Sequence, residues 1–147
     1  YTRKIIAPAD GDWPALQEVE GPLPKTQVGW EIYPEGLHAF LKRVHDGYSR
    51  DLPLYVTENG MAWEDKLVNG KVDDRQRVQY LNAHLGQVRR AIDDGVPVKG
   101  YFTWSLLDNY EWNVGYGPRF GIVHVDYKTQ TRTPKASYHA LKEALAR

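Results

Sequence analysis

The chain has 147 residues, of which 41% are hydrophobic and 26% are charged, a composition typical of globular proteins rather than disordered or collagen-like ones. Its 19 basic and 19 acidic residues balance, which gives no electrostatic reason to expect a nucleic-acid or membrane-surface partner. Cysteine is absent, which excludes disulfides, thiolate metal sites and cysteine nucleophiles.

The N-terminal part is expected to contain a long loop over residues 7–27. Four prolines and two glycines in this stretch interrupt both helices and strands. A helix is expected after Trp30, because Pro34 suits a first helical position and apolar residues then recur at helical spacing. This apolar face consists of Leu37, Phe40, Leu41 and Val44.

Two strands separated by a helix are expected in the middle of the chain. The strands are 54–57 and 98–105, and the helix between them is capped by Asp73 or Asp74 and ended by Gly95. Its inner face is predicted to be Val78, Leu81, Leu85, Val88 and Ile92. Its solvated or sheet-rim side is predicted to be Arg75, Arg77, Arg89 and Arg90. A crossover of this length indicates parallel strands.

The C-terminal part is expected to form a hairpin and a last helix. The hairpin arm 120–127 turns near residues 129–130, and a helix follows Thr133-Pro134. Its inner face is predicted to be Tyr138, Leu141 and Leu145. Two parallel strands cannot close a sheet, so the fold class is an α/β sheet or barrel that is incomplete by itself. An eight-stranded barrel takes about 250 residues.

Glu58 is the sharpest functional signal in the sequence. It follows directly on the expected buried strand 54–57, and catalytic groups of parallel α/β folds lie at the carboxyl ends of strands. Gly60 allows a sharp turn just beyond it. Position alone leaves two interpretations open, a functional carboxylate in a cleft or a surface glutamate that opens a loop.

A second signal is the aromatic and polar run 101–112, which continues the second strand. Trp and Tyr faces can stack on sugar rings, and carboxylates or amides can hydrogen-bond ring hydroxyls. Trp104, Asn109, Glu111 and Trp112 therefore suit a polyol site. The alternative is that Trp104 belongs to the core and Glu111 forms a salt bridge, since most aromatic residues serve packing.

Other chemistries have little support. The five histidines lack metal-ligand spacing, so each is expected to be structural or exposed. The glycines at 115, 117 and 121 do not match a dinucleotide fingerprint, and no Gly-x-Ser-x-Gly elbow exists. Asp73 and Asp74 are expected to cap a helix rather than form a catalytic pair.

Together, these segments resemble the C-terminal third of glycoside hydrolase family 1, the β-glucosidase family, over essentially the whole chain. The most specific piece is Tyr-Val-Thr-Glu-Asn-Gly at 55–60, which resembles the family's nucleophile motif after barrel strand seven. The run 104–112 resembles the segment after strand eight, and 29–37 resembles the entry to helix six. The resemblance implies one incomplete (β/α)8 (TIM) barrel portion over 1–147, with strands seven and eight, helices six to eight and no separate domain.

The resemblance also implies roles for individual residues. Glu58 would be the nucleophile, and Tyr1 would hydrogen-bond it and hold it ionised and oriented. Trp104 would form the floor of the sugar pocket. The remaining contacts would be Glu111 to O4 and O6, Trp112 to O3, Phe120 on the O6 side and Trp30 at the aglycone entrance.

The implied activity is hydrolysis of terminal β-D-glucosyl residues with retention, through a covalent glycosyl-enzyme. Retaining glycosidases need a second carboxyl as acid/base, which the family places in an Asn-Glu-Pro motif after strand four. No Asn-Glu-Pro occurs here. We therefore expect this chain alone to be inactive and to require an N-terminal remainder of the barrel as its partner. The expected substrate is a neutral β-glucoside or cellobiose-type sugar, with galactose and fucose left open as alternatives to glucose, and no metal or organic cofactor is expected.

Two rival interpretations are a non-catalytic sugar-binding protein and a scaffold fragment of such a barrel. The first predicts sugar affinity without hydrolysis, and the second predicts exposed apolar surface and poor cooperativity on melting. Because the chain begins at Tyr1 rather than Met, we expect sequence upstream of it. The lack of cysteine and of glycosylation sequons favours a cytoplasmic location.

Overall fold

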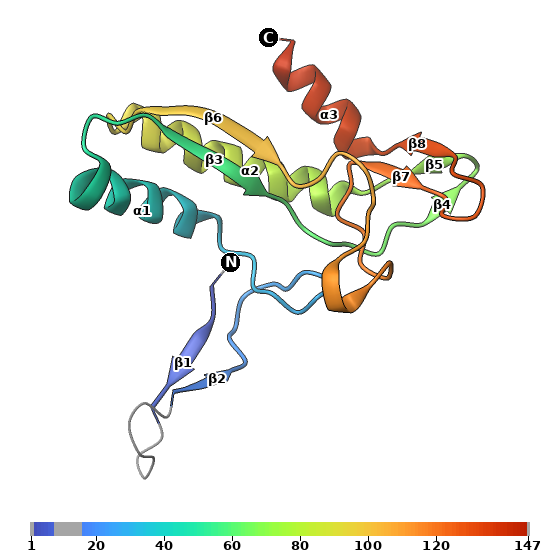
Figure 1. The fold of residues 1–147 in the computed structure, drawn as a ribbon, viewed down its shortest axis with the longest axis horizontal. Helices are drawn as coiled ribbons and strands as arrows, with labels where there is room; N and C mark the ends of the chain where they lie inside the picture. The colour runs from blue at the N-terminus through green and yellow to red at the C-terminus, as the bar shows by residue number, and fades with distance from the viewer. Residues whose placement is uncertain (1, 8–15, 147) are drawn as a thin grey trace.

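The computed structural model describes residues 2–7 and 16–146. Its centre is a pair of parallel strands, β3 (Leu54–Asn59) and β6 (Val98–Thr103), joined through the long helix α2 (Arg75–Asp93) (Figure 1). The predicted parallel pairing is therefore confirmed. Because the strands are parallel and adjacent, their carboxyl ends lie at the same edge of the pair.

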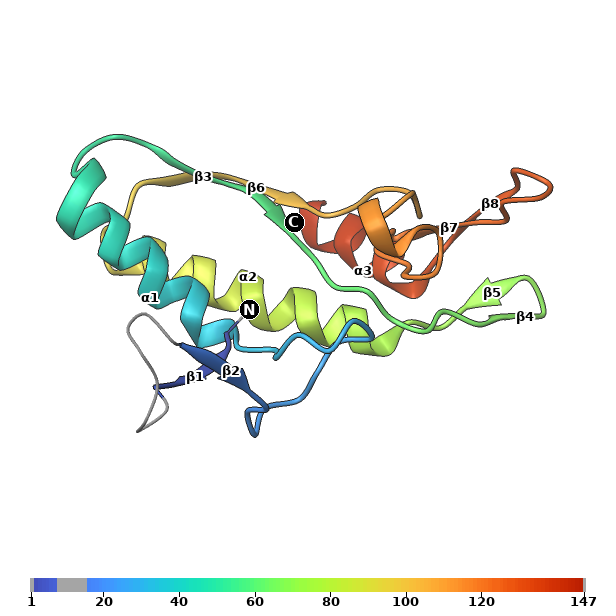
Figure 2. The same ribbon diagram turned by 60° about the horizontal axis from the view of Figure 1, so that its bottom comes forward.

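One face of the strand pair is covered by α1 (Pro34–Val44) and α2 (Figure 2). Pro34 lies in the first turn of α1, as predicted. The apolar cluster between strands and helices contains Leu41, Val56, Val88, Ala91, Val96 and Val98. Phe40 does not join it, because its ring lies on the exposed side of α1. A π-helical turn, His45–Ser49, extends α1 and leads toward β3.

The opposite face of the strand pair is open in the described part of the chain. Tyr55 and Phe102 alternate with the buried residues of their strands and are more than half exposed. The Tyr55 ring lies over Gly100, where a Cβ atom would approach its Cδ1 to 2.5 Å. Within the described residues, β3 and β6 pair only with each other. The strand pair thus has an open apolar face and two free edges.

The prediction of an uninterrupted loop over 7–27 is wrong at residues 17–19. These residues form β2 (Gln17–Val19), which pairs antiparallel with β1 (Lys4–Ile6). The segment lies between the prolines and has none of its own, so its backbone amides are available for a ladder. Residues 8–15, in the same predicted loop, lie outside the described residues.

Two further hairpins lie beside each other at one end of the molecule (Figure 1). One consists of β4 (Leu67–Val68) and β5 (Lys71–Val72), and the other of β7 (Val123–Val125) and β8 (Arg132–Pro134). The second turns at Gln130, whose φ of 61° is left-handed, so the predicted turn near 129–130 is confirmed.

The last helix, α3 (Ala136–Leu145), closes a second apolar cluster. Tyr138 and Leu141 pack as predicted against a core of Met61, Tyr80, Leu81, Ile122 and Val123. Leu145 does not, because its side chain is exposed at the end of α3. The cluster joins the segment after β3 to the segment before β7.

Helix α2 differs from its prediction at both the cap and the buried face. Asp74 precedes the helix, but its carboxylate makes no cap bond to it and instead accepts hydrogen bonds from Ser137 N and Oγ at 2.8 and 2.6 Å. It therefore caps the start of α3. Arg77, predicted on the solvated or rim side, is 0% exposed, whereas Ile92 of the predicted inner face is exposed. Arg77 is buried because buried carboxylates of Asp65 and Asp74 surround it.

Candidate active site

A cleft of about 350 Å³ lies at the carboxyl ends of β3 and β6. Its lining residues are Trp30, Glu58, Asn59, Gly60, Trp104, Glu111 and Phe120. They come from four separate segments: the turn before α1, the end of β3, the loop after β6 and the segment before β7. Five of the residues predicted to form the site thus line a single cleft.

Gly60 allows the two strand ends to approach closely enough to form the cleft. A Cβ atom at this position would lie 1.6 Å from the carbonyl oxygen of Trp104, which is backbone and cannot turn aside. The Trp104 amide also donates to the Asn59 carbonyl at 2.9 Å. The glycine therefore permits Glu58 and Trp104 to line the same cleft.

We expect Gly60→Ala to displace the Trp104 backbone and to lower the melting temperature of the protein by several degrees or more. The physical reason is overlap between the new methyl group and a carbonyl oxygen, which requires a shift of one strand end. Thermal unfolding followed by circular dichroism measures the effect. Gly86→Ala is the matched control, because a Cβ there meets nothing within 4 Å; equal losses in the two variants would contradict this role of Gly60.

Asn59 lines the cleft but was not assigned a role from the sequence. Its Oδ1 accepts a hydrogen bond from the Tyr101 hydroxyl at 2.7 Å, and its Nδ2 donates to the Tyr80 hydroxyl at 3.3 Å. Burial raises the pKa of Tyr101, so its hydroxyl remains a proton donor at neutral pH. The Asn59 side chain is thus held by Tyr101 of β6 and Tyr80 of α2. In the sequence, the only indication of a role for Asn59 is its place beside Glu58 in the 55–60 motif.

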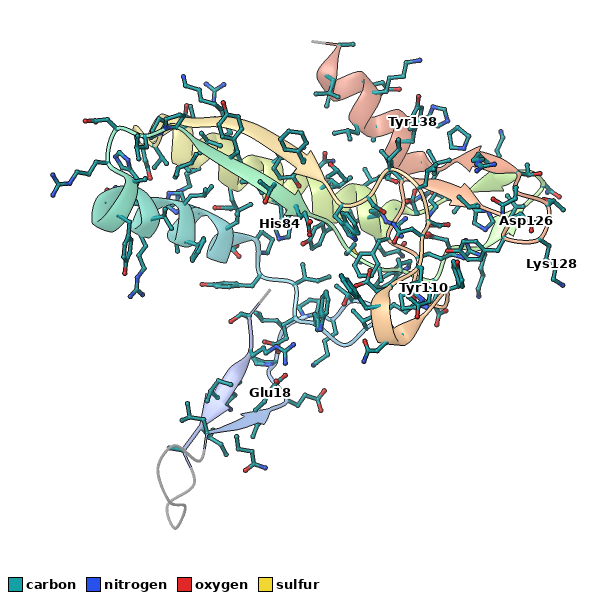
Figure 3. The ribbon with its side chains drawn as sticks, in the orientation of Figure 1. Glu18, His84, Tyr110, Asp126, Lys128 and Tyr138 are labelled. Carbon is teal, nitrogen blue, oxygen red and sulfur yellow. The ribbon has the colours of Figure 1, made fainter. Side chains whose placement is uncertain are left out.

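His84, which contacts Tyr80, is structural, as expected. His84 is buried, its ring stacks on Tyr80 with centroids 3.8 Å apart, and its Nδ1 lies 2.8 Å from the Tyr80 carbonyl oxygen. Burial lowers the pKa of His84 and therefore favours its neutral form. Figure 3 labels it on the side of the strand pair where α1 lies.

Trp30 and Phe120 form the aromatic wall of the cleft. Their ring centroids are 6.3 Å apart at an interplanar angle of 49°. Trp30 is fixed by a turn in which its amide donates to Thr26 Oγ1 at 3.2 Å and its carbonyl accepts from the Thr26 amide at 2.8 Å. Phe120 is buried in the described chain.

The loop after β6 brings Glu111 to the cleft but not Trp112. The Glu111 amide donates to the Gly115 carbonyl at 2.8 Å, which folds the loop back on itself. Trp112 begins the short 3-10 helix Trp112–Val114, is 80% exposed and is not among the cleft residues. Asn109 bonds Ser105 Oγ at 2.9 Å and is likewise absent from the lining. Tyr1 lies outside the described residues.

A larger cleft of about 620 Å³ contains none of the predicted site residues. It is lined by the turn at 25–27 and by side chains from 63–76, including Trp63, Lys66 and Lys71. No strand of the parallel pair ends there. Because catalytic groups of parallel α/β folds gather at strand ends, the smaller cleft is the candidate active site.

The described ranges contain neither a metal-ion cluster nor a membrane-spanning helix. In residues 2–7 and 16–146, no group of three or more His, Asp or Glu could hold a metal ion. In the same part of the chain, no helix combines the length and the apolar character needed to cross a bilayer.

A family model for glycosyl hydrolase family 1 matches residues 2–147. The chain belongs to this family. The expected family resemblance is therefore confirmed. The match covers the cleft-lining residues and the elements that position them.

Individual members of glycosyl hydrolase family 1 agree with this assignment. The chain is 54% identical over 130 residues to β-glucosidase A of Thermotoga maritima, a match that spans 87% of this chain and 29% of that protein. It is 46% identical over 120 residues to a 6-phospho-β-galactosidase of Clostridium acetobutylicum, which spans 82% of this chain and 25% of that protein. The chain thus spans less than a third of the length of these relatives.

The fold agrees as well. The structure superimposes on a family 1 β-glucosidase from T. maritima in complex with isofagomine lactam with a TM-score of 0.87 and 50% sequence identity. The superposition covers 90% of this chain and 30% of that enzyme. The fold is therefore similar to part of a family 1 TIM-barrel glycosidase.

Proposed function

We propose that this chain is the nucleophile-bearing part of a retaining β-glucosidase. The observation that supports the proposal is the single cleft that brings Glu58 together with Trp30, Trp104, Glu111 and Phe120. In the proposed barrel, β3 and β6 are strands seven and eight, and α1, α2 and α3 are helices six, seven and eight. The open face of the strand pair, with Tyr55 and Phe102, would then face the barrel interior.

In the proposed mechanism, Glu58 attacks the anomeric carbon of a β-glucoside. The bond between that carbon and the leaving oxygen breaks as the carboxylate–carbon bond forms, which gives an α-linked glycosyl-enzyme. An acid/base carboxyl about 5–5.5 Å from Glu58 protonates the leaving oxygen and then deprotonates the attacking water. We propose that an N-terminal segment of the barrel supplies it, since no Asn-Glu-Pro motif occurs in this chain.

The other residues would bind the sugar. Trp104 would form the floor of the pocket, Glu111 would accept hydrogen bonds from the hydroxyls at O4 and O6, and Phe120 would close the O6 side. Trp30 would line the aglycone entrance. Trp112 at O3 and Tyr1 beside Glu58 complete the proposed set, and Trp112 would have to turn toward the cleft from its exposed position.

We expect the complete enzyme, meaning this chain together with that N-terminal segment, to hydrolyse nitrophenyl β-glucoside with at least tenfold higher kcat/KM than its 6-phosphate. The reason is that the Glu111 carboxylate would repel a phosphate beside O6. The comparison is informative because one of the relatives is a 6-phospho-β-galactosidase. Steady-state kinetics on the two substrates measure the ratio, and a preference for the phosphorylated sugar would overturn the assignment of neutral substrates.

The rival scaffold interpretation shares one observation with the glycosidase. It predicts exposed apolar surface, and Tyr55 of β3 and Phe102 of β6 are each more than half exposed. Both interpretations explain this, because a barrel strand pair without its neighbours exposes its inner face. A functional carboxylate in an aromatic cleft is expected only for the glycosidase or a sugar-binding relative.

The test of the proposed function is the stereochemistry of β-glucoside hydrolysis by the complete enzyme, followed by proton NMR. We expect β-glucose to form first and then to mutarotate, since a double displacement retains configuration. Initial release of α-glucose would contradict the retaining mechanism. Sugar binding without any hydrolysis would favour the non-catalytic alternative.

A further inference from the structure

A buried network of six charged side chains lies behind the candidate active site, and no part of the proposed reaction uses it. Its three cations and three anions are Arg77, Arg119, Lys135, Asp65, Asp74 and Asp108. Apart from Arg119, whose side chain is 21% exposed, these side chains are at most 1% exposed. The charges balance within the network.

Lys135 joins the two loops that follow β3 and β6. Its ammonium group pairs with Asp65 of the first loop and with Asp108 of the second, the latter at 2.7 Å. It also donates to the Gly121 carbonyl. Burial beside the Arg77 guanidinium lowers the pKa of Lys135, and the two carboxylates oppose this shift by favouring its charged form.

Arg77 ties the network to the backbone on both sides of the cleft. Its Nε donates to the Met61 carbonyl at 3.3 Å, just after the cleft residue Gly60, and its NH2 donates to the Arg119 carbonyl at 2.8 Å. The same guanidinium bonds both oxygens of Asp65, at 3.1 and 3.0 Å. One side chain thus spans from the end of the Glu58 motif to the residue before Phe120.

Phe120 is bracketed by network contacts. The carbonyl of Arg119 is bound by Arg77, the carbonyl of Gly121 is bound by Lys135, and the amide of Gly121 donates to Asp108 Oδ1 at 3.0 Å. Gly121 also permits this approach, since a Cβ there would lie 2.2 Å from the Asp108 amide. The backbone on both sides of the ring is therefore fixed to buried charges.

We propose that this network is a positioning device that sets the place of Phe120 relative to Glu58, and that Lys135 is its central positioning residue. Buried ion pairs often add little net stability compared with apolar side chains, so their stabilising effect alone does not account for six of them. Their backbone contacts instead lie beside two cleft residues, Gly60 and Phe120. The contacted carbonyls are those of Met61, Arg119 and Gly121. The consequence for sugar selection rests on the proposed function, in which Phe120 closes the O6 side of the pocket.

The first readout is hydrogen exchange in the complete enzyme. In Lys135→Met, we expect the amides of residues 119–123 to exchange at least about tenfold faster than in the wild type. Lys128→Met is the matched control, because Lys128 is exposed at the tip of the β7–β8 hairpin (Figure 3) and belongs to none of the network's ion pairs. Unchanged protection of 119–123 in Lys135→Met would overturn the proposal.

The second readout compares a β-glucoside with a β-xyloside, which lacks the hydroxymethyl group at C5. A displaced Phe120 should lower kcat/KM for the glucoside about tenfold or more and for the xyloside less than about threefold. Equal losses on both substrates would show that the network merely holds the fold. Arg119→Met is a milder second variant for the case that Lys135→Met does not fold, and we expect the same direction from it.

Failure of the proposed function is separable from failure of this inference. If the wild-type enzyme hydrolyses neither substrate, the glycosidase proposal fails, whereas hydrogen exchange still decides whether Lys135 positions the Phe120 segment. If the wild type is active and Lys135→Met changes neither exchange nor the substrate ratio, the positioning role is wrong and the glycosidase proposal stands.

Discussion

In the complete enzyme, Glu58→Gln should lower kcat for β-glucoside hydrolysis by about 10⁴-fold or more while sugar binding remains measurable. The amide has nearly the shape of the carboxylate but lacks the nucleophilic oxygen that forms the ester bond to the anomeric carbon. Only the covalent step is therefore lost. Steady-state kinetics with nitrophenyl β-glucoside and titration with a glucose-shaped inhibitor separate the two effects.

The matched control is Glu64→Gln. Glu64 is exposed in the segment after β3 and lines the larger cleft rather than the candidate active site. We expect it to retain at least about half of the wild-type kcat, in keeping with the small effects of most exposed substitutions. Activity of Glu58→Gln close to that of Glu64→Gln would show that Glu58 is not the nucleophile.

A large effect on stability is expected for Asp74→Ala, at about 3–5 kcal/mol of the free energy of unfolding. The Asp74 carboxylate pairs with the buried Arg77 and accepts both hydrogen bonds from Ser137 at the start of α3. Its removal leaves Arg77 with one carboxylate fewer and the first turn of α3 without its cap. Urea denaturation of the protein and its variants measures the loss.

Asp73→Ala provides the comparison one residue away. Asp73 is exposed and pairs with the exposed side chain of Arg75 at 2.9 Å, so its contribution is screened by solvent. We expect its removal to cost less than about 0.5 kcal/mol. Similar losses for the two aspartates would contradict the structural role of Asp74.

The parts of the fold that follow from local pattern could be predicted from the sequence. The strand at 54–57 and the helix after it follow from patterns among neighbouring residues. A helix of that length between two strands indicates a parallel crossover. The strand pair then brings Glu58 and Trp104 to one edge without further information. The family resemblance added Trp30 and Phe120, which lie far apart in the sequence and meet in the cleft with centroids 6.3 Å apart.

The network could not be predicted, because its members find partners across the fold. An arginine at position 77 of an amphipathic helix reads as a surface residue unless Asp65 and the Arg119 carbonyl are known to meet it. Asp74 has the sequence signature of a cap for its own helix, but its acceptor oxygens are taken by Ser137, 63 positions later. Local propensity cannot distinguish these partners, since the choice depends on how α3 packs.

The most direct test of Glu58 as a glycosidase nucleophile is covalent trapping in the complete enzyme. A 2-deoxy-2-fluoro-β-glucoside with a good leaving group should slow the second step and leave the fluorosugar bonded to the enzyme. Peptide mass spectrometry should then find the label on Glu58 in the 55–60 motif, and Glu58→Gln should remain unlabelled. Label on another carboxylate, or turnover with no covalent species, would contradict the account.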